Sequence, residues 1–222
     1  MALRQGSRWT GAAGLWSLVF VAITLGLQWL PGAAQHWQFE RTAWAQGAWW
    51  QVLTAQWVHL GTLHASANAL GMVVLLRVFR GLVRGRLQAL ALLGGYAGVA
   101  AVLALDANCG FYAGASGALH GLLAGSACAL LTSQPPQPAP MARQRMHILG
   151  GCVLLGLAAK LLVQHFGTTS AVPGWLGFAT YYPAHEAGAL GGVLAVLGVA
   201  LVGRLVARLL GRTSPAGPDR TR

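Results

Sequence analysis

The sequence predicts an all-α membrane protein, a polytopic bundle of six transmembrane helices. Of its 222 residues, 55% are hydrophobic and 9% are charged, and the mean hydropathy is +0.56. Soluble domains carry about 25% charged residues, so water is not the main solvent of this chain. Apolar runs long enough to cross a hydrocarbon core of about 30 Å recur along almost the whole length. Arginines gather between alternate runs, as in multi-pass proteins.

Six apolar runs account for the predicted helices, and charged, glycine or proline residues close each of them. We expect spans over 13–30, 64–79, 87–105, 115–131, 147–164 and 185–203. A cleaved signal peptide is the alternative for the first run, but that run is long, is flanked by tryptophans and lacks a clear small-x-small cleavage site. We therefore expect it to stay as a helix. A proline-rich connector at 134–138 separates the fourth helix from the fifth.

The arginines predict the topology of the bundle. Those expected on the cytoplasmic side are Arg4, Arg8, Arg77, Arg80, Arg84, Arg86, Arg143, Arg145, Arg204, Arg208, Arg212, Arg220 and Arg222. The opposite side holds Arg41, with Lys160 near the end of the fifth span. The positive-inside rule then places both termini in the cytoplasm, and an even number of spans agrees with termini on one side. The net charge of +11 thus reflects membrane topology, and we expect no nucleic-acid partner.

These features define one membrane domain with two short ends. We expect a cytoplasmic segment over 1–12, a six-helix membrane domain over 13–205 and a basic cytoplasmic tail over 206–222. The expected location is the bacterial inner membrane, with the lipid bilayer as surrounding partner.

Three polar clusters stand out, because polar groups inside a span are costly and usually face the interior of a bundle. His59, His64 and Asn68 lie at the start of the second span, and His64 and Asn68 share one helical face. The fourth span opens with the sequence of Gly114–Gly117, and the sixth opens with that of Ala184–Gly188. The predicted topology puts all three clusters at the outward ends of their helices.

A serine and a histidine in these clusters suit nucleophilic catalysis. The hydroxyl of Ser116 is a weak nucleophile until a base takes its proton, and the imidazole of His185 is the natural base. Small residues allow two helices to approach closely. Facing stripes are expected from Gly117, Gly121 and Gly125 on one helix and Ala184, Gly188 and Gly192 on the other. They bring Ser116 within reach of His185 in a recessed, water-accessible pocket.

Peptide hydrolysis also needs hydrogen-bond donors where negative charge develops on the carbonyl oxygen. His64 and Asn68 can serve as such donors, and the backbone N–H of Ser116 adds a third at the positive end of the helix dipole. No third member of a triad is apparent, since Glu186 follows His185 directly and is turned about 100° around the helix. The sequence therefore predicts a Ser-His dyad.

These residues resemble the motifs of the rhomboid intramembrane proteases. The segment Gly114–Gly117 is similar to their G-x-S-G motif, and His185 lies in an A-H-x-x-G setting. His59, His64 and Asn68 are similar to the family's H-x4-H-x3-N helix. The resemblance extends over about residues 13–205 and includes the six-helix plan.

The resemblance implies a role for each residue. Ser116 is the expected nucleophile and His185 the general base, with His64, Asn68 and the Ser116 amide forming the oxyanion hole. Structural support is expected from Gly114, Gly117, Gly188 and His59. No metal and no cofactor is implied. The expected substrates are single-span membrane proteins, cut near the periplasmic face.

Within the family, the chain looks more like the rhombosortase branch than the larger rhomboids. This resemblance rests on the short length, on Trp-Trp-Gln-Val-Leu-Thr at 49–54 and on Gly-Ala-Leu-His after the serine. It implies exported substrates with a C-terminal glycine-rich stretch, one hydrophobic span and a basic tail. Two residues depart from the family pattern: Gln51 replaces the arginine of a W-R pair, and His120 replaces an aromatic residue that usually stacks on the base histidine.

Two other classes of function are alternatives. A non-catalytic rhomboid-like protein that binds transmembrane helices has no need of an intact Ser116 and His185. A metal enzyme or transporter using the histidines is the second. His185-Glu186 looks like the start of H-E-x-x-H, but position 189 is alanine, so the second zinc ligand is missing.

Overall fold

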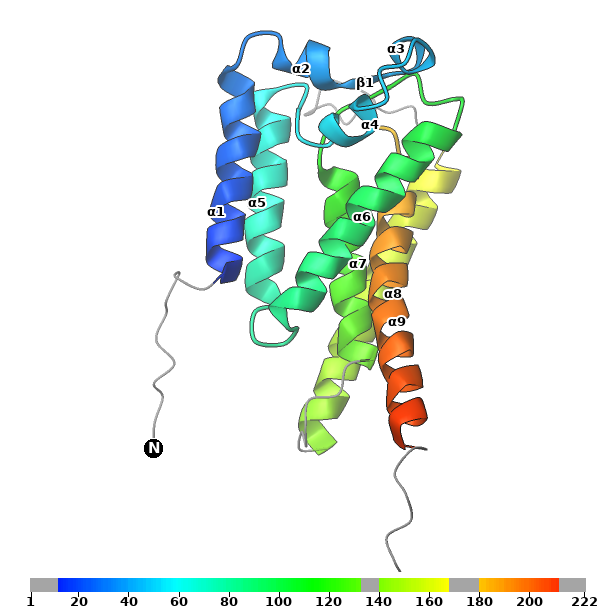
Figure 1. Cartoon of the computed structure of the whole chain (residues 1–222). Helices are drawn as coiled ribbons and strands as arrows, with labels where there is room; N and C mark the ends of the chain where they lie inside the picture. Colours follow the sequence, from blue (N-terminus) through cyan, green and yellow to red (C-terminus); the bar gives the residue numbers. More distant parts are fainter. Residues whose placement is uncertain (1–11, 133–139, 168–179, 212–222) are drawn as a thin grey trace, which may run out of the picture.

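A computed structural model describes residues 12–132, 140–167 and 180–211 (Figure 1). Six long helices dominate this part of the chain. They are α1 (Ala12–Gly26), α5 (Thr62–Val78), α6 (Gly85–Leu105), α7 (Ser116–Thr132), α8 (Pro140–Phe166) and α9 (Pro183–Gly211). Within the described ranges, α6, α8 and α9 are long and apolar enough to cross a membrane, while α1, α5 and α7 are shorter apolar helices. The helical membrane fold is confirmed, and the count of six spans stays a prediction.

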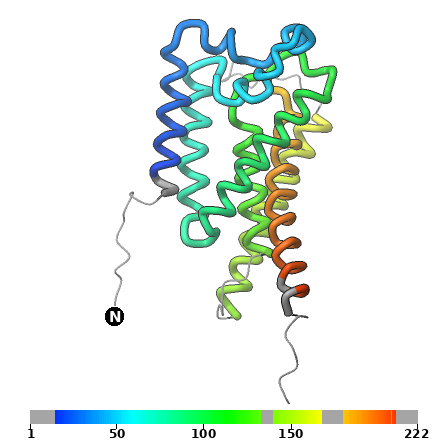
Figure 2. Tube along the Cα trace, in the orientation of Figure 1, coloured from blue at the N-terminus to red at the C-terminus, as the bar shows by residue number. Residues whose placement is uncertain are grey.

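The long helices form two groups. Helix α7 packs against α6, α8 and α9, whereas α1 packs along α5 (Figure 2). Leu122 of α7 is fully buried, in a cluster with Phe20 of α1 and Met72 of α5. Helix α7 is thus the central element, and its N-terminal residue is Ser116.

Glycines set the spacing between α7 and α9. A Cβ added to Gly188 would lie 2.0 Å from the carbonyl oxygen of Gly117, and one added to Gly192 would lie 2.1 Å from that of Gly121. Real Cβ contacts essentially never fall below 3.0 Å, so no larger residue fits at this separation. The predicted facing stripes of small residues are confirmed, and glycines of α6 extend them, because Gly94 meets α9 in the same way.

Two predicted helices are too short at their arginine-rich ends. Helix α8 begins at Pro140 and α9 continues to Gly211, beyond the apolar runs that end the prediction at 147 and 203. An apolar run shows only the part of a helix that lies in the hydrocarbon core. The helix itself can continue with polar residues beyond that core on either side. Proline occupies the first position of both helices, where its missing N–H costs nothing. The proline-rich connector, residues 1–11 and the end of the tail from 212 lie outside the described residues.

The connector between α1 and α5 is folded rather than open. It contains η1 (Leu27–Trp29), α2 (Ala33–Trp37), β1 (Phe39–Glu40), α3 (Arg41–Ala45) and α4 (Gln51–Thr54). Strand β1 pairs antiparallel with β2 (Phe111–Tyr112), which leads into α7. The described residues are mostly helical, as predicted. The strand pair was not predicted, because a strand of two residues carries no periodic signal. The pairing holds the connector against the segment that leads to Ser116 at the start of α7.

Arg41 anchors this connector from a position ten residues before Gln51. Its guanidinium donates hydrogen bonds to the carbonyl oxygens of Leu103 at 2.6 Å and Cys109 at 3.2 Å. It thereby satisfies a carbonyl at the C-terminal end of α6. Gln51 is buried, and its side-chain oxygen accepts a hydrogen bond from the backbone N–H of Glu40 at 3.1 Å. Arg41 and Gln51 thus both secure the connector.

Candidate active site

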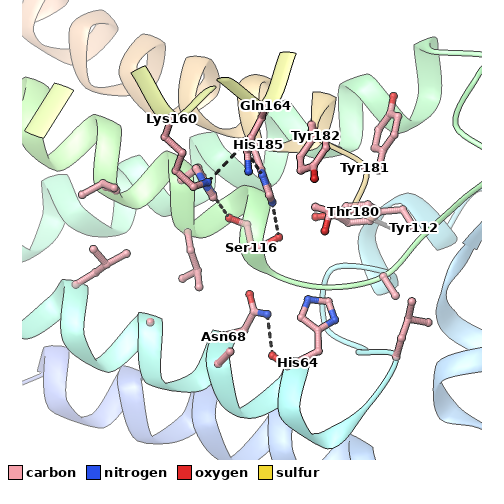
Figure 3. Close-up of a pocket in the computed structure, with 18 of the residues that line it drawn as sticks. His64, Asn68, Tyr112, Ser116, Lys160, Gln164, Thr180, Tyr181, Tyr182 and His185 are labelled. Carbon is pink, nitrogen blue, oxygen red and sulfur yellow. Dashed lines mark hydrogen bonds between the residues drawn. The ribbon is translucent and has the colours of Figure 1, made fainter. Parts of the chain in front are cut away.

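Ser116 and His185 meet at the end of the bundle where α7 and α9 begin. The Ser116 Oγ lies 2.9 Å from the Nε2 of His185 (Figure 3). Ser116 is the first residue of α7, and His185 lies in the first turn of α9. His185 is 6% exposed, while Ser116 is half-buried at the edge of a cavity of about 480 Å³. The geometry allows the hydroxyl to donate its hydrogen to the imidazole.

The packing of α7 on α9 sets this distance. Gly117 follows the serine, and a Cβ there would lie 2.7 Å from the carbonyl oxygen of Ala184, the residue before His185. Ala184 itself is fully buried. The two backbones therefore touch beside the Ser116–His185 pair, and a larger residue at either position would separate the pair.

The other ring nitrogen of His185 contacts a residue that the sequence reasoning missed. The His185 Nδ1 lies 3.2 Å from the Oε1 of Gln164, in the last turn of α8. With Nδ1 as the donor, Nε2 keeps a lone pair directed at the hydroxyl of Ser116. No sequence signal marks Gln164, because its partner is 21 residues away on another helix.

His120 stacks on His185. The ring centroids are 4.1 Å apart and the planes differ by 12°, so His120 stacks on the ring in place of the aromatic residue that the resemblance implies. Its Nδ1 lies 2.7 Å from the carbonyl oxygen of Ser116, and its Nε2 lies 2.6 Å from the Nζ of Lys160. His120 thus holds the face of the His185 ring and is itself held at both nitrogens.

His64 and Asn68 form the opposite wall of the same cavity, on α5 (Figure 3). Both are buried, at 8% and 4% exposure. The Asn68 amide donates one hydrogen bond to the carbonyl oxygen of His64 at 2.9 Å, which leaves the second amide hydrogen for the cavity. The structure therefore brings the four residues predicted as catalytic or oxyanion-hole residues, Ser116, His185, His64 and Asn68, around one space.

Gly114 and His59 shape the wall beside His64. Gly114 has φ of 124°, which disfavours other residues, and a Cβ there would lie 2.6 Å from the His64 ring. The Nε2 of His59 accepts a hydrogen bond from the backbone N–H of Ala115 at 3.4 Å. Burial, with His64 nearby, lowers the pKa of His59 to about 3, so its ring stays neutral and available as this acceptor.

Tyr112 is a second residue that the sequence reasoning missed. It is 5% exposed and lines the cavity. Burial raises the pKa of this phenol. Hydrogen bonding from the Gly117 amide and the Ser116 side chain lowers the pKa, but by less than burial raises it. The hydroxyl therefore stays protonated next to Ser116 and is available as a donor.

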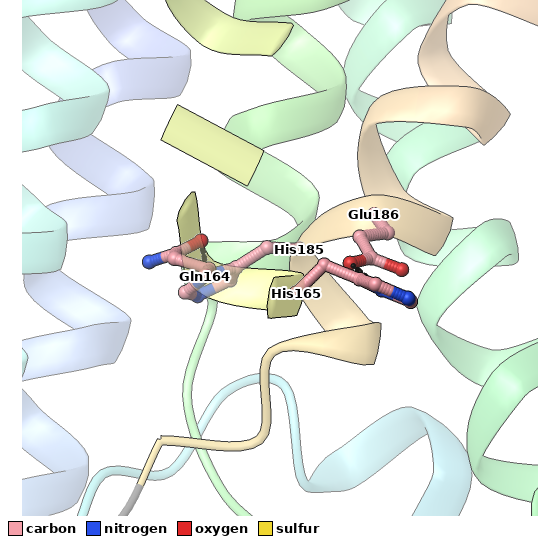
Figure 4. A network of polar contacts seen from close by, with 4 residues as sticks. All are labelled: Gln164, His165, His185 and Glu186. Atoms are coloured by element: carbon pink, nitrogen blue, oxygen red, sulfur yellow. Dashed lines mark hydrogen bonds and ion pairs between the residues drawn. The ribbon is translucent and has the colours of Figure 1, made fainter. Parts of the chain in front are cut away.

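Glu186 does not contact the His185 ring. Its Oε1 lies 2.9 Å from the Nδ1 of His165 on α8, on the outside of the helix pair (Figure 4). In the parts of the chain that the structure describes, no three His, Cys, Asp or Glu side chains lie close enough to hold a metal ion.

Comparison with known proteins identifies the family. The profile described as Rhomboid domain matches residues 46–202, a range that contains the cavity, α5 to α8 and most of α9. No curated protein and no solved structure matches the chain in the other two comparisons. Because the match covers well over half of the chain, the protein belongs to the rhomboid family of intramembrane proteases.

Proposed function

We propose that this protein is an intramembrane serine endopeptidase in which Ser116 is the nucleophile and His185 the general base. The observation that carries the proposal is the 2.9 Å contact between the Ser116 Oγ and the His185 Nε2, at the edge of a cavity with polar groups on its opposite wall. A hydroxyl beside a neutral imidazole acceptor is the arrangement that nucleophilic catalysis requires.

The chemistry follows from these two groups. The Ser116 oxygen attacks the carbonyl carbon of the scissile peptide while its proton passes to the His185 Nε2. The C–N bond then breaks, His185 returns the proton to the leaving amine, and an ester to Ser116 remains. Water, deprotonated by His185, attacks that ester, and the proton returns to Ser116 as the acid product leaves. No metal or cofactor is needed for this sequence.

Four donors surround the space where the oxyanion forms. The first N–H groups of a helix have no intrahelical partner, so the Ser116 amide at the start of α7 directs a hydrogen into the cavity region. Asn68 and His64 supply side-chain donors from α5, and Tyr112 adds its hydroxyl. Removal of one donor among several costs on the order of 10²-fold in rate.

The lining of the cavity favours an apolar segment as substrate. Below the polar groups it continues between apolar residues of α5 and α7, including Val74, Leu119 and Leu123. A single transmembrane helix presents such a surface, and glycine-rich sequence in it unwinds easily. We propose single-span exported proteins as substrates, with the glycine-rich C-terminal sorting tails of the rhombosortase branch as the specific class.

The proposed placement in the bacterial inner membrane uses all six long helices as spans, with 13–205 as the membrane domain. The arginines at the lower ends of α5, α8 and α9 then lie in the cytoplasm with both termini, and the cavity opens to the periplasm. The exposed Trp49 and Trp50 of the outer connector fall at the headgroup level.

Labelling with a fluorophosphonate separates this function from its alternative, a non-catalytic protein that binds transmembrane helices. The purified protein in liposomes should be modified at Ser116, and the His185→Ala variant should lose the modification while keeping its helical content. Absence of labelling in the intact protein, together with retained binding of a transmembrane peptide, favours the non-catalytic alternative.

A further inference from the structure

The orientation of the His185 ring depends on a side chain from a third helix. A neutral imidazole carries one hydrogen, on either Nδ1 or Nε2, and only the form with hydrogen on Nδ1 can accept a proton from Ser116. The Oε1 of Gln164 lies 3.2 Å from the His185 Nδ1 (Figure 4). An acceptor at this position selects the productive form of the ring.

An amide has an oxygen end and a nitrogen end, so its orientation must also be fixed. Lys160, one helical turn before Gln164, directs its Nζ at the same Oε1, at 3.4 Å. A lysine ammonium group has donors and no acceptor. Turning the amide over would place its NH₂ group against this ammonium and against the His185 N–H. Lys160 therefore holds the oxygen of Gln164 toward His185.

A second contact joins the same two helices beside the first. His165 and Glu186, the next residues after Gln164 and His185, pair at 2.9 Å between α8 and α9 (Figure 4). Adjacent residues on each helix thus make parallel contacts, one directed to the catalytic cavity and one to the outside. The outer pair is exposed, so it contributes little by itself.

We propose that Gln164, with its amide held by Lys160, is the positioning residue of the catalytic histidine and takes the place of the third member of a triad. The proposal rests on the proposed function of Ser116 and His185. An uncharged acceptor fixes the ring without adding a negative charge inside the membrane domain, where an unpaired carboxylate is costly.

The test compares two substitutions at this position with a matched control. Gln164→Leu removes the acceptor at similar size, and Gln164→Glu keeps an oxygen facing the His185 N–H. Gln144→Leu makes the same change on an exposed residue at the far end of α8. The measurements are kcat and KM for cleavage of a glycine-rich single-span substrate in liposomes.

Loss of ring orientation should lower kcat with little change in KM. General base catalysis contributes about 10²–10⁴-fold, so we expect Gln164→Leu to lose at least about 10²-fold. We expect Gln164→Glu to recover to within about tenfold of the intact protein and Gln144→Leu to match it. Equal losses in Gln164→Leu and Gln164→Glu would overturn the positioning role.

Nitrogen NMR of ¹⁵N-histidine-labelled protein gives a readout that does not depend on cleavage. The His185 signals, assigned by their loss in His185→Ala, should show hydrogen on Nδ1 in the intact protein and in Gln164→Glu. They should show a mixture of forms in Gln164→Leu, or in Gln164→Met if the leucine variant does not fold. An unchanged ring form in both apolar variants overturns the inference, whereas cleavage that persists in Ser116→Ala overturns the proposed function alone.

Discussion

Replacing Gly188 with alanine should slow cleavage by about 10²-fold, although residue 188 touches no reacting atom. The added methyl group would lie 2.0 Å from the carbonyl oxygen of Gly117, which is backbone and cannot rotate away. Cβ atoms essentially never come closer than 3.0 Å to another atom. The helices α7 and α9 must therefore move apart by about 1 Å to separate the new Cβ from this oxygen. Gly188 is one helical turn from His185, so the shift reaches the catalytic pair.

The magnitude follows from the hydrogen bond. A 1 Å shift takes the Ser116–His185 contact from 2.9 Å toward about 3.9 Å, beyond the range in which a hydrogen bond forms. A misplacement of that size costs about 10²-fold in rate. Overpacking of the interface should also lower the free energy of unfolding by about 1–3 kcal/mol.

The assay is cleavage of a reconstituted single-span substrate, with thermal unfolding in detergent measured in parallel. Gly198→Ala is the matched control, because it lies on the same helix and a Cβ there meets nothing within 4 Å. We expect the control to cleave like the intact protein. Wild-type cleavage by Gly188→Ala would refute the idea that close helix contact sets the catalytic distance.

Four further predictions concern single groups. Tyr112→Phe should slow cleavage by about 10²-fold at unchanged KM, since it removes one oxyanion donor, and an unchanged kcat would exclude that role. His120→Phe should keep more activity than His120→Ala, because the phenyl ring preserves the stacking on His185; equal kcat values in the two variants would argue against stacking. Arg41→Met should lower the free energy of unfolding by about 2 kcal/mol, and an unchanged melting temperature would contradict the anchoring role of Arg41. Chelators should leave cleavage unchanged, whereas inhibition reversed by added zinc would point to a metal.

Composition and spacing were enough to predict the helical membrane fold and the residues that meet in the cavity. Apolar runs report the depth of the hydrocarbon, and polar residues such as His64 and Asn68 at one end of a run indicate an interior site. The repeat of small residues around Gly188 predicted which two helices touch. These signals are local in sequence, or repeat at a fixed period, and so can be read without coordinates.

The missed features depend on contacts between distant segments. Gln164 is ordinary in its own helix and gains its role from a histidine on the next one. Tyr112 precedes the serine motif but is brought to the cavity by pairing with a two-residue strand in the outer connector. Arg41 is distant in sequence from Leu103, and only the folded connector reveals that it binds the carbonyl oxygen at the end of α6. Pairwise geometry of this kind leaves no pattern in a single sequence.

The most direct test of the account compares the C-termini of exported proteins from cells that carry the intact chain with those from cells that carry Ser116→Ala. With the intact chain, a set of released proteins should end within or next to a glycine-rich stretch that precedes a hydrophobic span. In the Ser116→Ala cells the same proteins should keep that span and remain in the membrane. Identical C-termini in both strains would contradict the assignment of Ser116 as the nucleophile of an intramembrane protease.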